Sequence, residues 1–168
     1  MTDLVMRQAT IDDADAIHAL IQTHLGEGHL LPRALEELRN HADRFIVSEI
    51  GGRLAACAEL APLSPKVAEV RSLVVSQDVR RVGLAARLVA ELRSRARSAG
   101  FQKLVAFTHD PRFFVRQNFS IVPHVWVPEK ITTDCLSCPL FRQCKQYAMV
   151  LPLQAAAGTT SARVARVA

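Results

Sequence analysis

A short basic segment is the feature of this sequence best suited to bind an anion. Residues 80–85 read Arg-Arg-Val-Gly-Leu-Ala and join a strand-like stretch to a helix-like stretch. A helix N-terminus has unpaired backbone N–H groups and a partial positive charge, and small residues let an anion approach that backbone closely. The segment therefore favours binding of a pyrophosphate beside Gly83 and Ala85, with Arg80 and Arg81 adding charge at the edge.

Spacing alone leaves an alternative to this anion site. The segment lacks the Gly-Lys-Ser/Thr of a P-loop and does not match G-x-G-x-x-G, so it can also be an ordinary turn before a helix with solvated arginines. The charge distribution favours an anionic partner. Residues 71–103 hold eight basic and two acidic residues, whereas the formal net charge of the whole chain is +5.

Two charged residues stand out in an apolar, strand-like stretch at residues 67–75. Simple alternation along this stretch places five residues on one face, namely Val67, Glu69, Arg71, Leu73 and Val75. Charges on a face that also carries Leu and Val indicate a cleft or a solvent channel beside the strand.

The elements that must position these residues alternate along the chain. Apolar spacing predicts helices at residues 11–21, 84–99 and 111–117, and another that begins near Pro32. Strands are predicted at residues 4–6, 45–47, 54–60, 67–75, 103–108, 121–122 and 147–151, with a proline-containing loop before the last. A tight hairpin at Gly51-Gly52 makes part of the sheet antiparallel. We expect one α/β (α+β) domain at residues 1–153 and a flexible tail at residues 154–168.

Composition excludes several classes of protein. Hydrophobic residues make up 49% of the chain and charged residues 22%, which suits a packed domain. No window holds the ~18 apolar residues of a membrane span, and the start of the chain does not read as a secretory signal. We therefore expect a cytoplasmic protein. The arginine-rich helix suggests a nucleic-acid-binding module as another class, but one Trp, one Tyr and no binding motif argue against it.

From residue 4 to residue 151 the chain resembles the GCN5-related N-acetyltransferases (GNAT). Residues 80–85 match the R/Q-x-x-G-x-G/A loop of that family, and the preceding strand, the following helix and residues 112–119 occur in the family's order. A narrower resemblance is to short bacterial amino-acid N-acetyltransferases of the N-acetylglutamate synthase type, and it is carried by residues 30–33, 108–114, 128–130, and 134–144 followed by 148–149. The resemblance implies the GNAT fold, with a mixed, mostly antiparallel sheet flanked by helices.

What the resemblance implies is an enzyme that uses acetyl-CoA. The strand backbone would pair with the pantetheine arm, the loop amides would bind the pyrophosphate, and a strand amide would polarise the thioester carbonyl. Phe114 stands where many relatives carry a tyrosine that protonates the departing thiolate, so that role does not carry over. The implied acetyl-CoA contacts are Leu73, Val74, Val75, Arg80, Arg81, Val82, Gly83, Leu84, Ala85 and Phe114.

The acceptor must lose a proton, because only a neutral amine attacks a thioester. Glu69 is the candidate general base, acting through a water or with a pKa raised by burial, and the alternative is a salt bridge to Arg71. Arg33 is the candidate for holding the α-carboxylate of an amino acid, with Arg71 and Lys130 as further candidates. The alternative for Arg33 is an exposed residue at a helix start. Thr108 ends a strand and can contact substrate or the sulfur of CoA.

Three cysteines form a C-x2-C-x5-C pattern at Cys135, Cys138 and Cys144. Zinc normally takes four ligands, and His124 or Asp134 can supply the fourth. A single C-x2-C pair with one further cysteine is a weak metal signal, and the resembled enzymes need no metal for transfer. We therefore expect no metal, and a loop that packs over the substrate.

The predicted function is transfer of an acetyl group from acetyl-CoA to the α-amine of free glutamate or glutamine, the first step of arginine biosynthesis. Another small-molecule amine or a protein amine stays open as the acceptor, and so does a metal-sensing regulator built on the cysteines. The expected partners are acetyl-CoA and the amino-acid acceptor, without nucleic acid or membrane, and a homodimer stays open.

Overall fold

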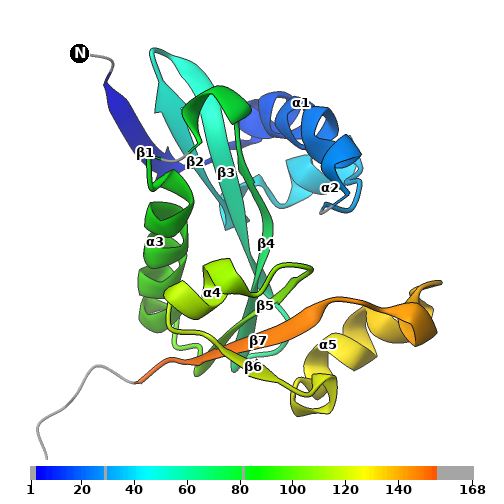
Figure 1. Ribbon diagram of the computed structural model, residues 1–168. Helices are drawn as coiled ribbons and strands as arrows, with labels where there is room; N and C mark the ends of the chain where they lie inside the picture. The colour runs from blue at the N-terminus through cyan, green and yellow to red at the C-terminus, as the bar shows by residue number, and fades with distance from the viewer. Residues whose placement is uncertain (1–2, 29, 81, 155–168) are drawn as a thin grey trace, which may run out of the picture.

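The described residues form one seven-stranded sheet in the order β1-β2-β3-β4-β5-β7-β6 (Figure 1). The computed structural model describes residues 3–28, 30–80 and 82–154. Neighbouring strands are antiparallel except β4 and β5, which are parallel, so the predicted mixed, mostly antiparallel sheet is confirmed. The strands are β1 Leu4–Gln8, β2 Phe45–Ile50, β3 Arg53–Pro62, β4 Val67–Val75, β5 Lys103–Thr108, β6 Ser120–Val122 and β7 Tyr147–Pro152.

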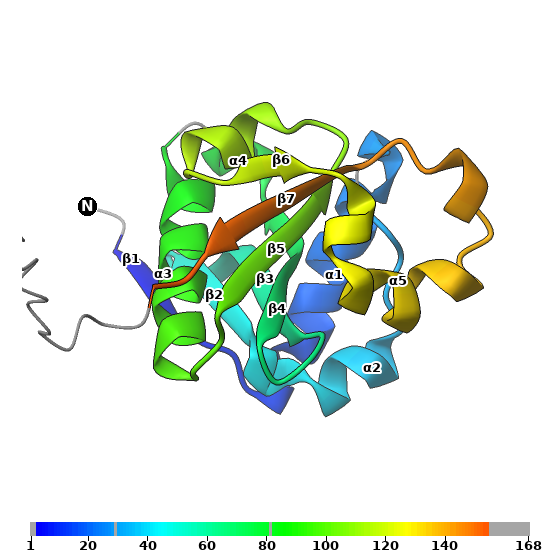
Figure 2. The same ribbon diagram turned by 90° about the horizontal axis from the view of Figure 1, so that it is seen from below.

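Helices cover both faces of this sheet. Figure 2 shows α3 on one side of the sheet and α1 on the other, with α5 on the α1 side. Each side has its own core, one built around α3 and the other around α1 and α2. The α-helices are α1 Ala14–His24, α2 Leu35–Asn40, α3 Leu84–Ser98, α4 Arg112–Arg116 and α5 Pro128–Thr133.

Helix α3 forms as its apolar spacing predicts. Leu84, Leu88, Leu92 and Ala96 recur every four residues and are buried in the core. Full burial of one leucine stabilises the fold by about 1.5–3 kcal/mol. The helix ends before Gly100, whose φ of +86° is the left-handed conformation that favours glycine at a helix end. This buried stripe fixes where the N-terminus of α3 lies.

A β-bulge in β4 changes which residues share a face. The register between β3 and β4 shifts between Cys57 and Glu59, and Ser72 opposite has a φ of +48°. Val74 therefore packs in the α1 core, while Leu73 and Val75 pack against the α3 core. The prediction that Leu73 and Val75 lie on the same face as Glu69 and Arg71 is wrong, because simple alternation does not survive a bulge.

Strands β4 and β5 separate after a short paired stretch. Among the described residues they pair only over residues 67–69 and 103–105, and β5 then pairs with β7 along its length. Residues 70–75 of β4 thus have no partner strand on the β5 side within the described part of the chain. The separation opens the sheet at its centre, beside the bulge.

Other differences from the predicted elements are local. The sequence predicts a loop at Pro128, but helix α5 begins there. A proline is well tolerated in the first turn of a helix, so Pro128 does not prevent the helix. The helix predicted to begin near Pro32 is α2, which begins at Leu35 with Ala34 as its N-cap. The predicted tail falls almost wholly on residues 155–168, outside the described residues. A search of the described helices finds none with the length and apolarity to cross a membrane.

Candidate active site

A cavity of about 1130 Å³ lies where β4 and β5 separate. Its walls come from residues 69–75 of β4, the end of β5, the segment between α1 and α2, the N-terminus of α3, helix α4 and helix α5 with the cysteine segment. Except for Arg81 and Val82, the structure brings every predicted site residue to this cavity. Arg81 lies outside the described residues, and the Val82 side chain is 66% exposed and outside the lining.

One end of the cavity contains the N-terminus of α3. Gly83 is the N-cap, and its φ of +75° is a backbone conformation that most L-residues adopt only with strain. Leu84 and Ala85 follow it in the lining. Because the helix has 15 residues, its first unpaired N–H groups and its dipole make this end of the cavity favourable for an anion.

Arg80 is held beside this helix end by an acidic partner. Its Nη2 donates to both carboxylate oxygens of Glu27 at 2.8 Å, and its Nε donates to the Val75 carbonyl oxygen at 3.1 Å. Gln77 donates to the same carboxylate at 2.8 Å. The hydrogen bonds from Gln77 and Arg80 lower the pKa of Glu27, so the carboxylate stays charged at neutral pH.

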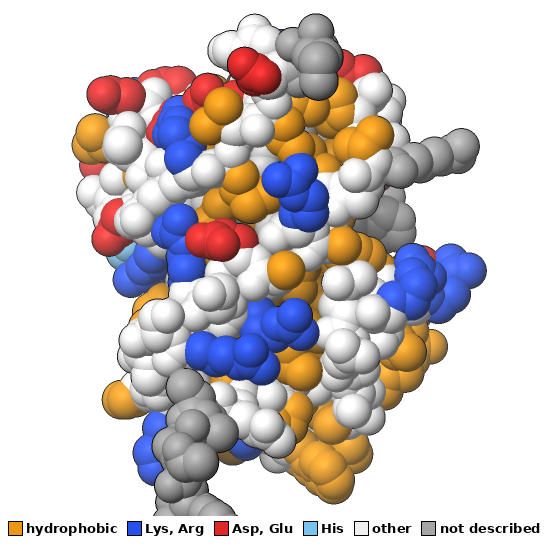
Figure 3. All heavy atoms as spheres, turned by 90° about the vertical axis from the view of Figure 1, so that its left-hand side faces the viewer, with side chains coloured by type: hydrophobic (Ala, Val, Ile, Leu, Met, Phe, Trp, Pro, Cys, Tyr) orange, Lys and Arg blue, Asp and Glu red, His pale blue; other side chains and the backbone are white. Residues whose placement is uncertain are grey.

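The basic side chains on the α3 side of the molecule do not form a continuous strip. Figure 3, which faces the α3 side, shows separate groups of Lys and Arg side chains with hydrophobic and neutral surface between them. Arg95 is partly neutralised, since it donates to Glu91 at 2.9 Å. The predicted local excess of positive charge is therefore divided between the helix surface and the cavity.

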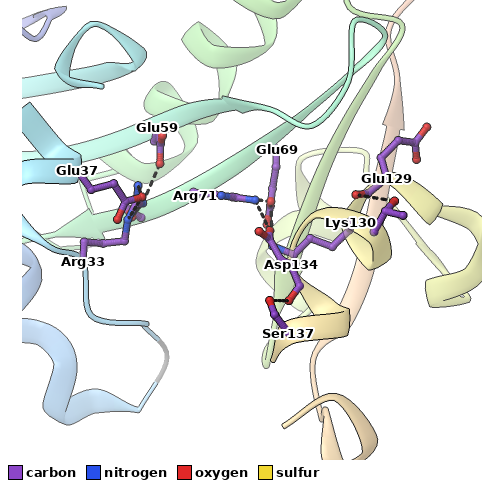
Figure 4. A network of polar contacts seen from close by, with 11 residues as sticks. Arg33, Glu37, Glu59, Glu69, Arg71, Glu129, Lys130, Asp134 and Ser137 are labelled. Carbon is purple, nitrogen blue, oxygen red and sulfur yellow. Dashed lines mark hydrogen bonds and ion pairs between the residues drawn. The ribbon is translucent and has the colours of Figure 1, made fainter. Parts of the chain in front are cut away.

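Glu69 lies at the other end of the cavity, between two cations (Figure 4). Arg71 Nε donates to its Oε2 at 2.6 Å, and Lys130 Nζ lies 2.9 Å and 3.0 Å from its two oxygens. Asp134 bonds to both cations, to Lys130 at 2.8 Å and also to Arg71. Lys130 also lies over the Phe107 ring, 5.2 Å from its centre. The salt bridge from Glu69 to Arg71, the alternative raised from sequence, is present.

Arg33 forms a second group with Glu37 and Glu59. Figure 4 shows Arg71 between the two groups, with its guanidinium directed toward Glu69. Arg33 Nη1 donates to Glu59 at 2.8 Å and to Ser72 Oγ at 2.7 Å. Its Nε and Nη2 donate to one Glu37 oxygen at 3.1 Å and 2.7 Å. Its side chain is 10% exposed, so Arg33 is not the exposed helix-start residue of the alternative interpretation.

The charges of these groups support one another. Burial lowers the pKa of Arg33, but hydrogen bonds to Glu37 and Glu59 outweigh it and raise that pKa above its ordinary value. The Arg33 hydrogen bond in turn lowers the pKa of Glu37. Burial likewise lowers the pKa of Arg71, but the charge and hydrogen bond of Glu69, together with the charges of Asp134 and Glu59, raise that pKa above its ordinary value. These guanidinium groups therefore stay charged inside the cavity wall.

Phe114 and Thr108 have packing and turn roles in addition to lining the cavity. Phe114 is buried and makes edge-on contacts with Phe113 and Phe119, with ring centres 5.1 Å and 5.2 Å away. Thr108 Oγ1 donates to the Asp110 carbonyl oxygen and accepts from its N–H, both at 3.1 Å. Both residues thus shape the wall formed by β5 and α4.

The three cysteines line the same cavity on the segment after α5. Cys144 Sγ lies 4.0 Å from His124 Nε2, and burial raises the pKa of the Cys135 thiol. Over residues 3–28, 30–80 and 82–154, no group of three or more His, Cys, Asp or Glu side chains has an arrangement that could hold a metal ion.

Sequence reasoning does not identify four residues of the Arg33 and Glu69 groups. Glu59 falls within a predicted strand of mostly apolar residues, where a lone carboxylate signals a buried partner. Glu37 lies four residues after Arg33, the helical spacing of an ion pair. The sequence suggests Asp134 as a metal ligand and not as a partner of Lys130 and Arg71, and nothing local marks Ser72 as the site of a bulge.

Three comparisons with known proteins bear on this site. A family model described as "Acetyltransferase (GNAT) family" matches residues 13–119. An uncharacterized N-acetyltransferase of Chlorobaculum tepidum is 31% identical over 151 residues, covering 90% of this chain and 97% of that protein. The amino-acid acetyltransferase of Ralstonia nicotianae is 34% identical over 121 residues, covering 70% of this chain but only 27% of that protein.

A solved structure is similar over nearly the whole described chain. N-acetylglutamate synthase from Neisseria gonorrhoeae, complexed with coenzyme A and N-acetyl-glutamate, is 28% identical with a TM-score of 0.81. The match covers 92% of this chain and 36% of that one. The present chain therefore corresponds to only part of the longer relatives.

Proposed function

Because the chain belongs to the acetyltransferase (GNAT) family, we propose that it transfers an acetyl group from acetyl-CoA to the α-amine of free glutamate or glutamine, as the first step of arginine biosynthesis. The observation that carries this proposal is the pair of charged groups around Arg33 and Glu69, which lie in one cavity with the N-terminus of α3. One end suits a pyrophosphate, and the other suits an amine with a neighbouring carboxylate.

The residues at the α3 end fit coenzyme A. Residues 70–75 of β4 have no strand partner on the β5 side within the described chain, so an extended pantetheine arm can pair with that backbone. Gly83 and Ala85 leave the helix N–H groups open to a pyrophosphate, and Arg80 adds a cation. When bound, acetyl-CoA supplies the acetyl group as a thioester.

The acceptor end supports a zwitterionic substrate. Arg33, Arg71 and Lys130 are the cations available for a carboxylate, and Thr108 ends the strand beside them. Each of these cations already has a carboxylate partner, which holds it in place before substrate arrives. In this proposal Arg33 binds the α-carboxylate through its planar fork.

Glu69 is the proposed general base. Its two oxygens accept three hydrogen bonds from Arg71 and Lys130, and a carboxylate has about four lone-pair sites. One site on Oε1 remains for a water or for the ammonium itself. The acceptor ammonium first gives one proton to Glu69, directly or through that water, and Glu69 passes this proton to solvent. The neutral amine nitrogen then bonds to the acetyl carbon, the carbon–sulfur bond breaks, and the nitrogen gives its second proton to Glu69. CoA leaves as a thiolate that takes up one proton, so the whole transfer releases one proton.

An acceptor screen tests this proposal. Purified protein is mixed with acetyl-CoA and each free amino acid, and the released CoA thiol is followed with a thiol reagent. We expect release with glutamate or glutamine and a loss of about 10²–10⁴-fold in kcat for Glu69→Gln. Turnover only with polyamines or protein amines would replace the proposed acceptor, and no turnover with any amine would overturn the proposal.

A further inference from the structure

The guanidinium of Arg33 is nearly saturated by the protein's own acceptors. Of its five N–H donors, four are directed at Glu37, Glu59 and Ser72, at distances of 2.7 to 3.1 Å. The two donors that face Glu37 are the Nε–H and one N–H of Nη2. Together they form the edge of the guanidinium that an incoming carboxylate would need for a bidentate contact. A substrate carboxylate can therefore bind this edge only if one of the acceptors leaves.

The two carboxylates on Arg33 differ in their freedom to leave. The Glu59 side chain is 1% exposed and lies on strand β3, inside the sheet, so its departure from Arg33 would leave the buried Glu59 charge without its ion-pair partner. The Glu37 side chain is 43% exposed, lines the cavity and comes from the six-residue helix α2. When Glu37 turns away from Arg33, water can solvate its carboxylate, so the Glu37 charge is not left buried without a partner.

We propose that Glu37 occupies the carboxylate subsite of Arg33 in the empty enzyme and is displaced by the α-carboxylate of the acceptor. The inference rests on the proposed function, because it assumes that Arg33 binds that carboxylate. Glu37 is then a residue that sets the affinity for the acceptor, while Glu59 and Ser72 hold Arg33 in place throughout.

Competition of this kind lowers the apparent affinity in a calculable way. The apparent dissociation constant equals the intrinsic one divided by the fraction of enzyme in which Arg33 is free of Glu37. Because the Arg33 hydrogen bond lowers the pKa of Glu37, the competing carboxylate stays charged through the neutral range. A neutral side chain at position 37 is a much weaker competitor, so the acceptor should bind more tightly.

Calorimetry on the protein loaded with CoA, which cannot transfer an acetyl group, tests this directly. The ligands are L-glutamine and L-glutamate, and the variant is Glu37→Gln. We expect their dissociation constants to fall about three- to tenfold in the variant, with CoA affinity unchanged. The matched control is Glu36→Gln, which removes the same charge from the neighbouring residue, whose side chain is 75% exposed, and should bind as the parent protein does.

Glu37→Ala provides a second variant with no hydrogen-bonding group, and it should also bind the acceptor more tightly. Equal or weaker binding in both Glu37 variants would overturn the inference, and so would an equal gain in Glu36→Gln, because the effect would then be one of overall charge. The two proposals fail separately. If the amino acids bind more tightly to Glu37→Gln but the parent protein releases no CoA thiol with them, only the proposed function is wrong.

Discussion

Replacing Glu59 by glutamine removes the buried charge that faces Arg33 but keeps the shape of the side chain. Glu59 accepts from Arg33 Nη1 at 2.8 Å, and both side chains are almost fully buried. Removing one partner of a buried ion pair costs about 3–5 kcal/mol, because the other charge is left without compensation. Arg33 keeps Glu37 and Ser72, so we expect a loss below that range, about 2–3 kcal/mol in the free energy of unfolding.

Equilibrium urea unfolding followed by circular dichroism measures this loss. The denaturation midpoint should fall while the slope m stays constant, because the surface exposed on unfolding does not change. In a thermal scan, a chain of this size loses about 2–4 °C per kcal/mol, so the midpoint should fall by ~4–12 °C. The double variant Arg33→Met/Glu59→Gln should lose less than the two single variants added together, because the uncompensated charge is gone.

A loss below ~0.5 kcal/mol in Glu59→Gln would refute the reasoning, since it would mean that Arg33 needs no buried carboxylate. Strict additivity in the double variant would refute it independently. Glu36→Gln serves as the control for a carboxylate on the surface and should lie within ~0.5 kcal/mol of the parent protein.

Three further predictions concern single positions. Gly83→Ala should lose about 1 kcal/mol of stability in urea unfolding, because a Cβ there meets nothing within 4 Å and the cost is the left-handed backbone alone; an unchanged midpoint would contradict this. Burial raises the pKa of Cys57 to about 12, so mass spectrometry of iodoacetamide-treated native protein at pH 8 should find Cys138 and Cys144 modified and Cys57 unmodified. The Arg7 hydrogen bond lowers the pKa of Asp13. The ionised Asp13 therefore stabilises the fold above about pH 4, and this contribution is lost as the pH falls toward the lowered pKa. In Asp13→Asn the free energy of unfolding should fall less steeply at acid pH than in the parent protein, and parallel profiles of the two proteins would contradict this prediction.

Features set by local chemistry were predictable from the sequence. The start of α3 followed from the turn at Gly83 and the leucine spacing after it, and the hairpin followed from Gly51 and Gly52, which both have positive φ. In each case the residue type determines the backbone conformation within a few positions, so no tertiary information is needed.

Features set by distant contacts were not predictable in the same way. The bulge at Ser72 depends on how β4 meets β3, and it reverses the faces of Leu73 and Val75. The environment of Glu69 depends on Lys130, 61 positions later in the chain, and that of Arg33 depends on Glu59, 26 positions later. A single sequence shows the charges of these residues but not which of them meet.

Binding of coenzyme A at the N-terminus of α3 is the claim on which the other functional claims depend. Isothermal titration calorimetry of the purified chain with CoA measures it without assuming any acceptor. We expect a saturable heat from a single class of sites, weaker in Arg80→Ala and weaker at high salt, because the phosphates are held partly by charge. A titration without heat of association at millimolar CoA would contradict it.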